Sequence, residues 1–188
     1  GDLLIRKRVT RVRDAHVHEE VKLTIPNYQR PYKWTAKNAI QLLDDIIEAK
    51  KENKEVYRVG TLILHHDLSE QCYNIVDGQQ RIITFTLLLK ALGADGLTFL
   101  QEKLTDNPYT RKNIASNYRA FERRLYAMAE LRTKAEGSLE KLCDDRVITE
   151  LREFIEERCE LIVVVTNDIS EAFQFFDSQN ARGKKLYP

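Results

Sequence analysis

Runs of alternating and β-branched residues predict the strands of a sheet. Val21–Ile25 alternates apolar and polar side chains with a period of two, which is typical of a half-buried strand. Val59–His65 and Cys72–Val76 are rich in strand-forming residues and flank a short polar link, so they predict an antiparallel hairpin. Leu161–Val165 is continuously apolar, which indicates a strand covered on both faces. Leu3–Arg13 alternates apolar and basic groups and fits either a first strand or a docking segment.

Apolar residues that recur every three or four positions predict the helices. Thr35 has the side chain of an N-cap, and the pattern after it predicts a helix that runs to about Lys51. The segment 82–92 has almost no polar face, so we expect its helix to lie at the centre of the fold and to end at Gly93. Further amphipathic patterns predict an all-helical insertion over residues 97–158.

These elements together predict an α+β fold, with a mixed sheet, packed helices and the helical insertion. We expect residues 1–96 to form the α/β core and residues 159–188 to complete it with a returning strand, a helix and a loop. A chain of 188 residues should bury about 70% of the surface that its unfolded form exposes. The sequence therefore predicts a substantial hydrophobic core.

Composition and charge narrow the class of protein. Hydrophobic residues make up 43% of the chain and charged residues 31%, and the sequence contains neither a signal peptide nor a membrane-length apolar stretch. We therefore expect a cytoplasmic protein without a membrane partner. The formal charge is only +1, so any contact with nucleic acid needs a local basic face. Arg119, Arg123 and Arg124 can form such a face, although a solvated helix surface is the simpler explanation for them.

One polar pentad, Asp77-Gly78-Gln79-Gln80-Arg81, stands between the second strand of the hairpin and the central helix. Local rules predict Asp77 as the N-cap, with Gln80 at the third helical position reaching back as in a capping box. Arg81 fits that arrangement poorly, because a cation in the first turn opposes the helix dipole. A bound anion would remove the conflict, since helix N-termini attract phosphate groups. A capped turn and a phosphate site both remain possible at this point.

Two other loops share the polar character of the pentad. The first lies between Pro26 and Pro31, which restrict the residues before them to extended conformations. The second follows a short predicted helix near the end of the chain. Three polar loops joined by apolar elements can converge on one crevice. The residues of interest in these two loops are Tyr28, Gln29, Arg30, Asn180, Arg182 and Gly183.

Four blocks of this sequence resemble a known family. They are IPNYQRPYKW, VGTLIL, YNIVDGQQRIITFTLLLKAL and FQFFDSQNARGKKL, in that order. The combination resembles the DGQQR-signature family typified by GmrSD-type modification-dependent restriction proteins, whose N-terminal domain looks like the ParB and sulfiredoxin fold. The resemblance implies a nucleotide-binding domain, and a nucleotide-hydrolysing one, that acts as a sensor in bacterial defence against phage DNA.

The resemblance also implies roles for individual residues. Gly78 would let the backbone approach the phosphates of an NTP, while Gln79 and Gln80 would donate to phosphate oxygens. Arg81 would supply positive charge, and Asp77 would hold a Mg²⁺-bound water or position the nucleophile. Asp77, Gln80 and Arg81 are therefore the expected catalytic residues. The residues named in the other two loops would line the same crevice.

Proteins of this type often continue past the RGxxL block into a separate HNH-like nuclease domain, whereas this sequence ends at Pro188. We therefore expect it to be a piece of a longer protein, with DNA as a partner of the whole and cleavage dependent on the missing part. Two alternatives remain open. One is a non-catalytic module that recognises DNA or a modified base through Tyr28, Arg30 and Trp34, and the other is nuclease action like that of some ParB-like domains.

Overall fold

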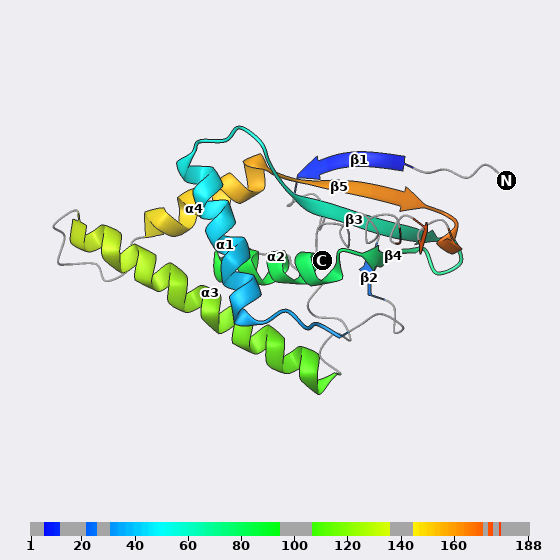
Figure 1. Ribbon diagram of the computed structural model, residues 1–188, viewed down its shortest axis with the longest axis horizontal. Coiled ribbons are helices and arrows are strands. Elements are labelled where there is room, and N and C mark those ends of the chain that lie inside the picture. The colour runs from blue at the N-terminus through cyan, green and yellow to red at the C-terminus, as the bar shows by residue number, and fades with distance from the viewer. Residues whose placement is uncertain are drawn as a thin grey trace, which may run out of the picture.

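A five-stranded mixed sheet forms one side of the molecule in the computed structural model (Figure 1). The strands are β1 (Arg6–Arg11), β2 (Lys22–Thr24), β3 (Tyr57–Asp67), β4 (Cys72–Asp77) and β5 (Cys159–Thr166), and their order in the sheet is β1-β5-β3-β4-β2. The structure describes residues 6–11, 22–25, 31–94, 107–135, 145–170, 173–174 and 177. The predicted α+β class and the mixed sheet are confirmed.

The strand pairing includes the hairpin that the sequence predicts. Strands β3 and β4 form the expected antiparallel hairpin, and β5 lies between β1 and β3, antiparallel to the first and parallel to the second. The N-terminal segment therefore contains a strand, which settles the choice left open for it. The short strand β2 pairs in parallel with β4 at the edge of the sheet. In this order β4, which ends at Asp77, lies between β3 and the edge strand β2.

Helix α2 (Gln79–Ala91) is the central helix that the sequence predicts. Every residue from Ile82 to Leu89 is buried, so no face of this segment is left for water. The helix lies between β3 on one side and helix α3 on the other. It ends before Gly93, whose φ of 82° is the left-handed conformation that glycine adopts after a helix.

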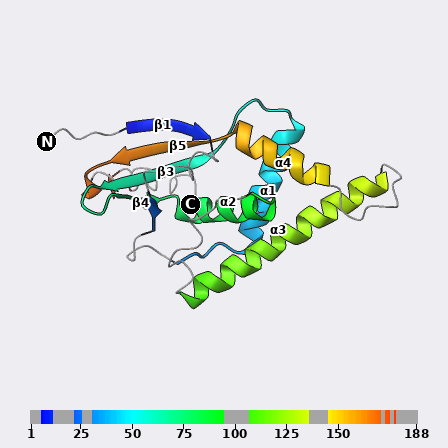
Figure 2. The ribbon, with the colours of Figure 1, turned by 180° about the vertical axis from the view of Figure 1, so that it is seen from behind.

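Three other helices pack around α2 on the same side of the sheet, as the front and back views both show (Figures 1 and 2). They are α1 (Ala36–Lys51), α3 (Pro108–Ala135) and α4 (Asp145–Arg158). Helices α3 and α4 confirm the helical character predicted for the described part of residues 97–158. Their apolar side chains, among them Phe121 and Ile155, belong to the same core cluster as the side chains of α1, α2 and the sheet.

Helix α1 begins and ends where the sequence predicts. Thr35 is its N-cap, and the side chain of Asn38 reaches back so that its Oδ1 accepts a hydrogen bond from the amide of Thr35 at 3.0 Å. The buried face of the helix consists of Ala39, Leu42, Leu43, Ile46 and Ala49. No helix in the described part of the chain is both long and apolar enough to cross a membrane.

Candidate functional site

The pentad lies at the junction of β4 and α2, but the helix begins one residue later than predicted. Gly78 is the N-cap, with φ of 101° and no side-chain capping hydrogen bond, and Gln79 is the first helical residue. The prediction that Asp77 caps the helix, with Gln80 completing a capping box, is therefore wrong. The physical reason is the left-handed conformation of Gly78, which places the turn from strand to helix at the glycine instead of the aspartate.

The structure requires a glycine at position 78 because the turn is packed against β3. A Cβ atom at this position would lie 2.9 Å from the carbonyl oxygen of Thr61 and 3.0 Å from Cδ1 of Leu62. Both contacts are shorter than or at the limit of what real side chains show, and the φ of 101° is itself unfavourable for a side chain. Gly78 therefore fixes the start of α2 against the backbone of the sheet.

The first turn of α2 leaves its backbone donors open. The first helical hydrogen bond is made by the amide of Ile82, which donates to the carbonyl of Gly78 at 2.9 Å. Within the described residues, the amides of Gln79, Gln80 and Arg81 have no hydrogen-bond acceptor. Three free donors at the positive end of a helix dipole favour an anion at this turn.

Asp77 is the last residue of β4, and its carboxylate is half-buried. Burial raises its pKa above the ordinary value, because removal from water disfavours the charged form, and the backbone amide of Gly78 opposes this by donating to the carboxylate. No cation pairs with Asp77 among the described residues. The carboxyl group is thus half-buried, and no cation among the described residues neutralises its ionised form.

The side chains of the two glutamines are already used inside the protein. Gln79 Nε2 donates to the carbonyls of Ile75 at 3.0 Å and Val76 at 2.9 Å, which ties the helix to the strand that precedes it. Because Nε2 of Gln79 makes both of these bonds, it is not available to donate to a ligand. The expected donation from Gln79 to a phosphate would therefore require this contact with β4 to break.

Gln80 joins the pentad to the end of the first polar loop. Its Oε1 accepts hydrogen bonds from the amides of Lys33 at 2.7 Å and Trp34 at 3.2 Å, and its Nε2 donates to the carbonyl of Pro31 at 3.2 Å. Three contacts from one side chain hold the segment 31–34 against the start of α2. The two motifs lie almost 50 residues apart in sequence, at separations of 46 to 49 positions, and Gln80 brings them together.

Tyr32 anchors the same segment in the core. The residue is only 1% exposed, and its hydroxyl lies 2.7 Å from Thr84 Oγ1 of α2. Helix α3 holds its backbone, because Thr110 Oγ1 accepts from the Tyr32 amide at 3.0 Å and Asn113 Nδ2 donates to the Tyr32 carbonyl at 2.8 Å. Burial raises the pKa of Tyr32, while its hydrogen bonds to Thr84 and Asn117 oppose that rise. The tyrosine is therefore a structural anchor.

Asn117 is a fully buried residue of α3 that sequence reasoning missed. Its Nδ2 donates both to the hydroxyl of Tyr32 at 2.8 Å and to the carbonyl of Trp34 at 2.8 Å. Its Oδ1 is buried and has no partner in the described part of the chain. The signal in the sequence was Asn113 followed by Asn117, two amides one turn apart beside an apolar stripe. Buried amides at that spacing indicate that the helix holds another segment of backbone.

Arg81 extends from the first turn of α2 across the surface of Trp34. Its Cζ lies 5.4 Å from the centre of the Trp34 ring, and its side chain fills the space that the absence of a Cβ leaves at Gly60. Burial lowers the pKa of Arg81, while the nearby Tyr57 and Asp45 act in the opposite direction. In the part of the chain that the structure describes, the guanidinium has no hydrogen bond or ion pair. It is a half-buried cation held in place by stacking and packing.

The remaining predicted site residues lie outside the described residues. They are Tyr28, Gln29, Arg30, Asn180, Arg182 and Gly183. What the structure does bring together is the pentad and the Pro31–Trp34 end of the first loop. The expected convergence of all three loops stays a prediction.

Asp77 is the carboxylate that the pentad offers for a metal ion. They contain no cluster of three or more His, Cys, Asp or Glu side chains that could hold a metal. A Mg²⁺ ion usually binds through one or two carboxylates together with substrate phosphates and waters. The donor set at Asp77 therefore fits a Mg²⁺ ion carried in by a nucleotide, and it does not fit a metal held by these residues alone.

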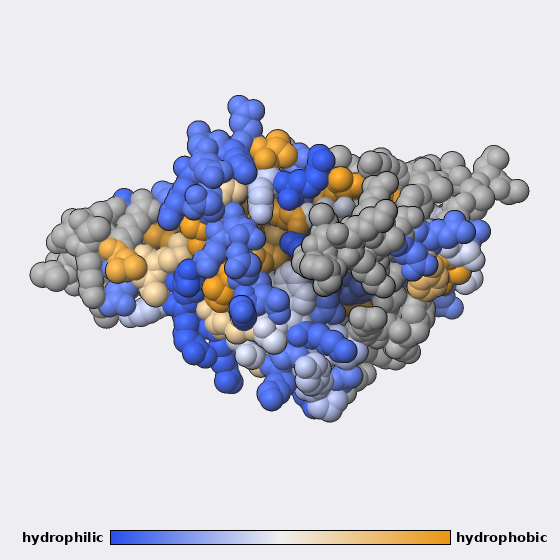
Figure 3. Space-filling view, viewed as in Figure 1, coloured by the Kyte–Doolittle hydropathy of each residue, from blue (hydrophilic) through white to orange (hydrophobic). Residues whose placement is uncertain are grey.

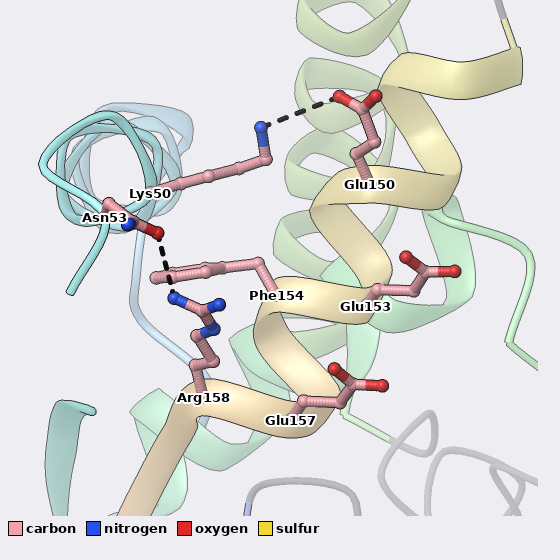
Figure 4. A pocket seen from close by; sticks show the side chains of 7 residues that line it. All are labelled: Lys50, Asn53, Glu150, Glu153, Phe154, Glu157 and Arg158. Carbon is pink, nitrogen blue, oxygen red and sulfur yellow. Dashed lines mark hydrogen bonds and ion pairs between the residues drawn. The ribbon is translucent and has the colours of Figure 1, made fainter. Parts of the chain in front are cut away.

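A separate pocket of about 270 Å³ lies between the C-terminal end of α1 and helix α4 (Figure 4). Its ion pair joins Lys50 to Glu150 at 3.7 Å, and Arg158 donates to Asn53 Oδ1 at 3.0 Å. Figure 4 shows the carboxylate of Glu157 directed away from Lys50. The 16 residues of α1 span about 24 Å, so this pocket is at the opposite end of the helix from Thr35 and the pentad.

Comparison with known proteins supports the resemblance seen in the sequence. The model of the family described as the GmrSD restriction endonuclease N-terminal domain matches residues 12–188. A search among curated proteins found no match. The matched range contains the pentad, the loop held by Gln80 and helices α1 to α4. The chain therefore belongs to the family of GmrSD restriction endonuclease N-terminal domains.

Proposed function

We propose that this module of a restriction protein binds the phosphates of an NTP at the first turn of α2, hydrolyses the nucleotide, and so acts as a sensor in defence against phage DNA. The observation that carries the proposal is Arg81. A half-buried guanidinium without an ion pair in the described residues, placed beside three open amides at a helix N-terminus, has the chemistry of a phosphate site.

In this proposal the residues of the pentad have different roles from those that the sequence resemblance implies. The open amides of the first turn and Arg81 would bind phosphate oxygens, because the side chains of Gln79 and Gln80 are engaged with β4 and the loop. Gln80 would then act as a positioning residue that holds Trp34 under Arg81. We also propose, as part of the same function, that the domain is similar to the ParB and sulfiredoxin fold.

Asp77 is the residue proposed for the hydrolytic step. Its half-buried carboxylate has no cation partner among the described residues, so it is available to orient a water or to bind the Mg²⁺ of an Mg–NTP complex. Magnesium, when bound with the nucleotide, neutralises charge on the phosphates. Electrostatic attraction to such a complex would also favour the ionised form of Asp77 that burial disfavours.

Calorimetric titration with each NTP in the presence of Mg²⁺ tests binding. Arg81→Ala should weaken the affinity by about ten- to a hundredfold, since hydrogen bonds to charged groups contribute roughly 1.5–3 kcal/mol. Trp34 is the sole tryptophan of the chain, so quenching or enhancement of its fluorescence would locate the ligand beside Arg81. Arg124→Ala, which removes a cation on α3 that pairs with Asp44, is the control. No binding of any NTP, or equal binding by the Arg81→Ala variant, would refute the proposal.

Hydrolysis is tested separately by Asp77→Asn. This change keeps the size and polarity of the side chain, so we expect turnover to be lost while the melting temperature stays nearly the same. A fall of several degrees with turnover retained would instead assign Asp77 a structural role.

The alternative function is recognition of DNA or of a modified base, with the turn binding a DNA phosphate. It shares the chemistry of the amides and Arg81, and the exposed side of the Trp34 and Arg81 stack would suit a base. DNA affinity that falls steeply with salt and does not change when NTP is added would favour this function. Cleavage of plasmid by the chain with Mg²⁺ or Mn²⁺ would favour the nuclease alternative.

A further inference from the structure

Helix α3 presents a basic face to solvent on the side opposite its contacts with the core. Lys112, Ser116, Arg119 and Arg123 are all exposed and follow one another at steps of four, three and four residues. On an α-helix this spacing places them in one narrow stripe. Hydrophilic residues dominate the lower edge of the molecule, where the first half of α3 lies (Figures 1 and 3).

The charge of α3 contrasts with that of the whole chain. The helix contains two acidic residues, Glu122 and Glu130, and seven basic ones, which gives it a formal charge of +5, whereas the whole chain has +1. The basic residues are Arg111, Lys112, Arg119, Arg123, Arg124, Arg132 and Lys134. The positive charge of the protein is thus concentrated on one helix, and the remainder of the chain is acidic.

The fold does not use the cations of this stripe. Lys112, Arg119 and Arg123 have no ion pair or hydrogen bond from their side chains among the described residues. Arg124 is different, because its Nη2 lies 2.6 Å from Asp44 Oδ1 of α1. The three arginines that the sequence suggested as one basic face are therefore divided, with Arg124 facing α1 and the other two facing solvent.

This arrangement is unfavourable in the isolated protein. Arg119 and Arg123 are like charges four residues apart, which destabilises a helix by a few tenths of a kcal/mol. Lys112 lies near the start of α3, where a cation opposes the helix dipole and no acidic residue is present in the first turn. A row of anions spaced along the helix would remove these repulsions.

We propose that this stripe of α3 binds the sugar-phosphate backbone of duplex DNA. From Lys112 to Arg123 the helix rises about 16 Å, comparable to about five base pairs of B-DNA. Arg, Lys and Ser side chains are common donors to DNA phosphates, and such contacts position a protein without reading sequence. The occupant is DNA because the family is one of restriction proteins.

The surface is distinct from the proposed nucleotide site. Thr110, whose side chain is buried on the core side of the same helix, holds the backbone of Tyr32, whereas the stripe is on the opposite, exposed side. The inference does not depend on NTP binding, because phosphate contacts on α3 require neither Arg81 nor Asp77.

Fluorescence anisotropy with a labelled 20-base-pair duplex, without nucleotide and over a range of salt concentrations, tests the proposal. Arg119→Ala with Arg123→Ala should lower the affinity about tenfold or more at about 100 mM salt and should reduce the slope of log K against log[salt] by about 2, as expected for the loss of two phosphate contacts. The substitutions are at exposed positions, so the melting temperature should change little.

Arg124→Ala is the matched control, because it removes the same charge from the next residue of the same helix but from the side that faces Asp44. It should leave the salt slope unchanged. Equal losses in the control and the double variant would mean that only net charge matters, and would overturn the proposal. So would an unchanged affinity in the double variant, or the absence of DNA binding by the unaltered chain at low salt. NTP titration of the double variant should match the unaltered chain, which separates this outcome from failure of the nucleotide site.

Discussion

Helices α1 and α2 both begin beside the Pro31–Trp34 segment, but their first turns are stabilised in different ways. At α1, Thr35 is followed by Asn38, whose side chain reaches back to the Thr35 amide, so the start of the helix is completed by residues three positions apart. At α2, Gly78 has no side chain to offer, and no side-chain capping bond replaces it. One helix start is satisfied locally, and the other remains open.

The side chains that would ordinarily cap α2 are used to hold distant backbone. Gln79 bonds β4 and Gln80 bonds the Pro31–Trp34 segment, while Arg81 stacks on Trp34. The turn is therefore held by several contacts, yet among the described residues its amides have no acceptor and its cation has no ion pair or hydrogen bond. A helix start with this combination is better suited to a ligand than to stability, whereas the start of α1 has the opposite balance.

Gly78→Ala should have the largest effect on this difference. The new Cβ would lie too close to the Thr61 carbonyl, and the alanine would have to adopt a φ near 101°. We therefore expect a loss of about 2–4 kcal/mol in the free energy of unfolding. Thr35→Ala at α1 should cost only about 1 kcal/mol, the usual effect of losing a polar N-cap. Urea denaturation of both variants gives the comparison. Similar losses would mean that the two turns are equally constrained.

Asn117→Ala should affect stability less but reach the site from α3. It removes two buried hydrogen bonds, so we expect a loss of roughly 1–3 kcal/mol and a shift in the emission of Trp34, whose carbonyl loses its donor. Thr110→Ala, which loses a contact with Tyr32 but none with Trp34, is the control. It should lower stability without the same emission shift.

A double-mutant cycle shows whether α2 and α3 act together on the loop. Gln80 accepts from the amide of Trp34 and Asn117 donates to its carbonyl, so Gln80→Ala combined with Asn117→Ala should show a coupling of about 0.5 kcal/mol or more. Additive losses would indicate that the two helices hold the segment independently. NTP affinity should fall in either variant if the position of Trp34 supports Arg81, and it should stay unchanged if the network is only structural.

Much of the fold followed from local patterns. The hairpin, the bounds of α1 and the buried character of α2 depend on residues within one element, and the sequence predicted each of them. The start of α2 was misplaced because Asp77 is a good N-cap in isolation, whereas the backbone of β3 decides that Gly78 turns. A contact with a different strand is invisible to a rule that considers four consecutive residues.

The candidate site was predictable only in part for the same reason. Arg81 stood out because its charge conflicts with the helix dipole, and the structure leaves that conflict in place. Its surroundings, however, come from other parts of the chain: Trp34 lies in the loop before α1, and Gly60 and Tyr57 lie in β3. Asn117 lies in a helix whose apolar stripe attracted attention instead. When a side chain holds the backbone of a distant segment, the sequence around it shows only a polar residue at a buried position.

The smallest predicted effect concerns the charge of Asp77 and its dependence on pH. Burial raises the pKa of this carboxyl in the folded protein, so the native state binds a proton more tightly than the unfolded chain. The contribution of Asp77 is therefore fully present below the ordinary carboxyl pKa and is lost as the pH rises through the raised value. Asp77→Asn removes this dependence, so the free energy of unfolding of the variant should rise relative to that of the unaltered chain as the pH increases above the ordinary carboxyl pKa. The difference should be small, because the carboxyl group is partly exposed.

Measurement of the unfolding free energy of both proteins at several pH values isolates this one carboxyl, because the other ionisable groups are common to the two and cancel in the difference. If the two curves of unfolding free energy against pH stay parallel, burial does not disfavour the charged form of Asp77. The starts of α1 and α2 would then not differ in this electrostatic respect. An Mg–NTP complex bound beside Asp77 should have the opposite dependence. Ionisation strengthens a carboxylate's attraction to Mg²⁺, so the affinity of the unaltered chain should rise over the pH range in which its stability falls, and the Asp77→Asn variant should show neither trend.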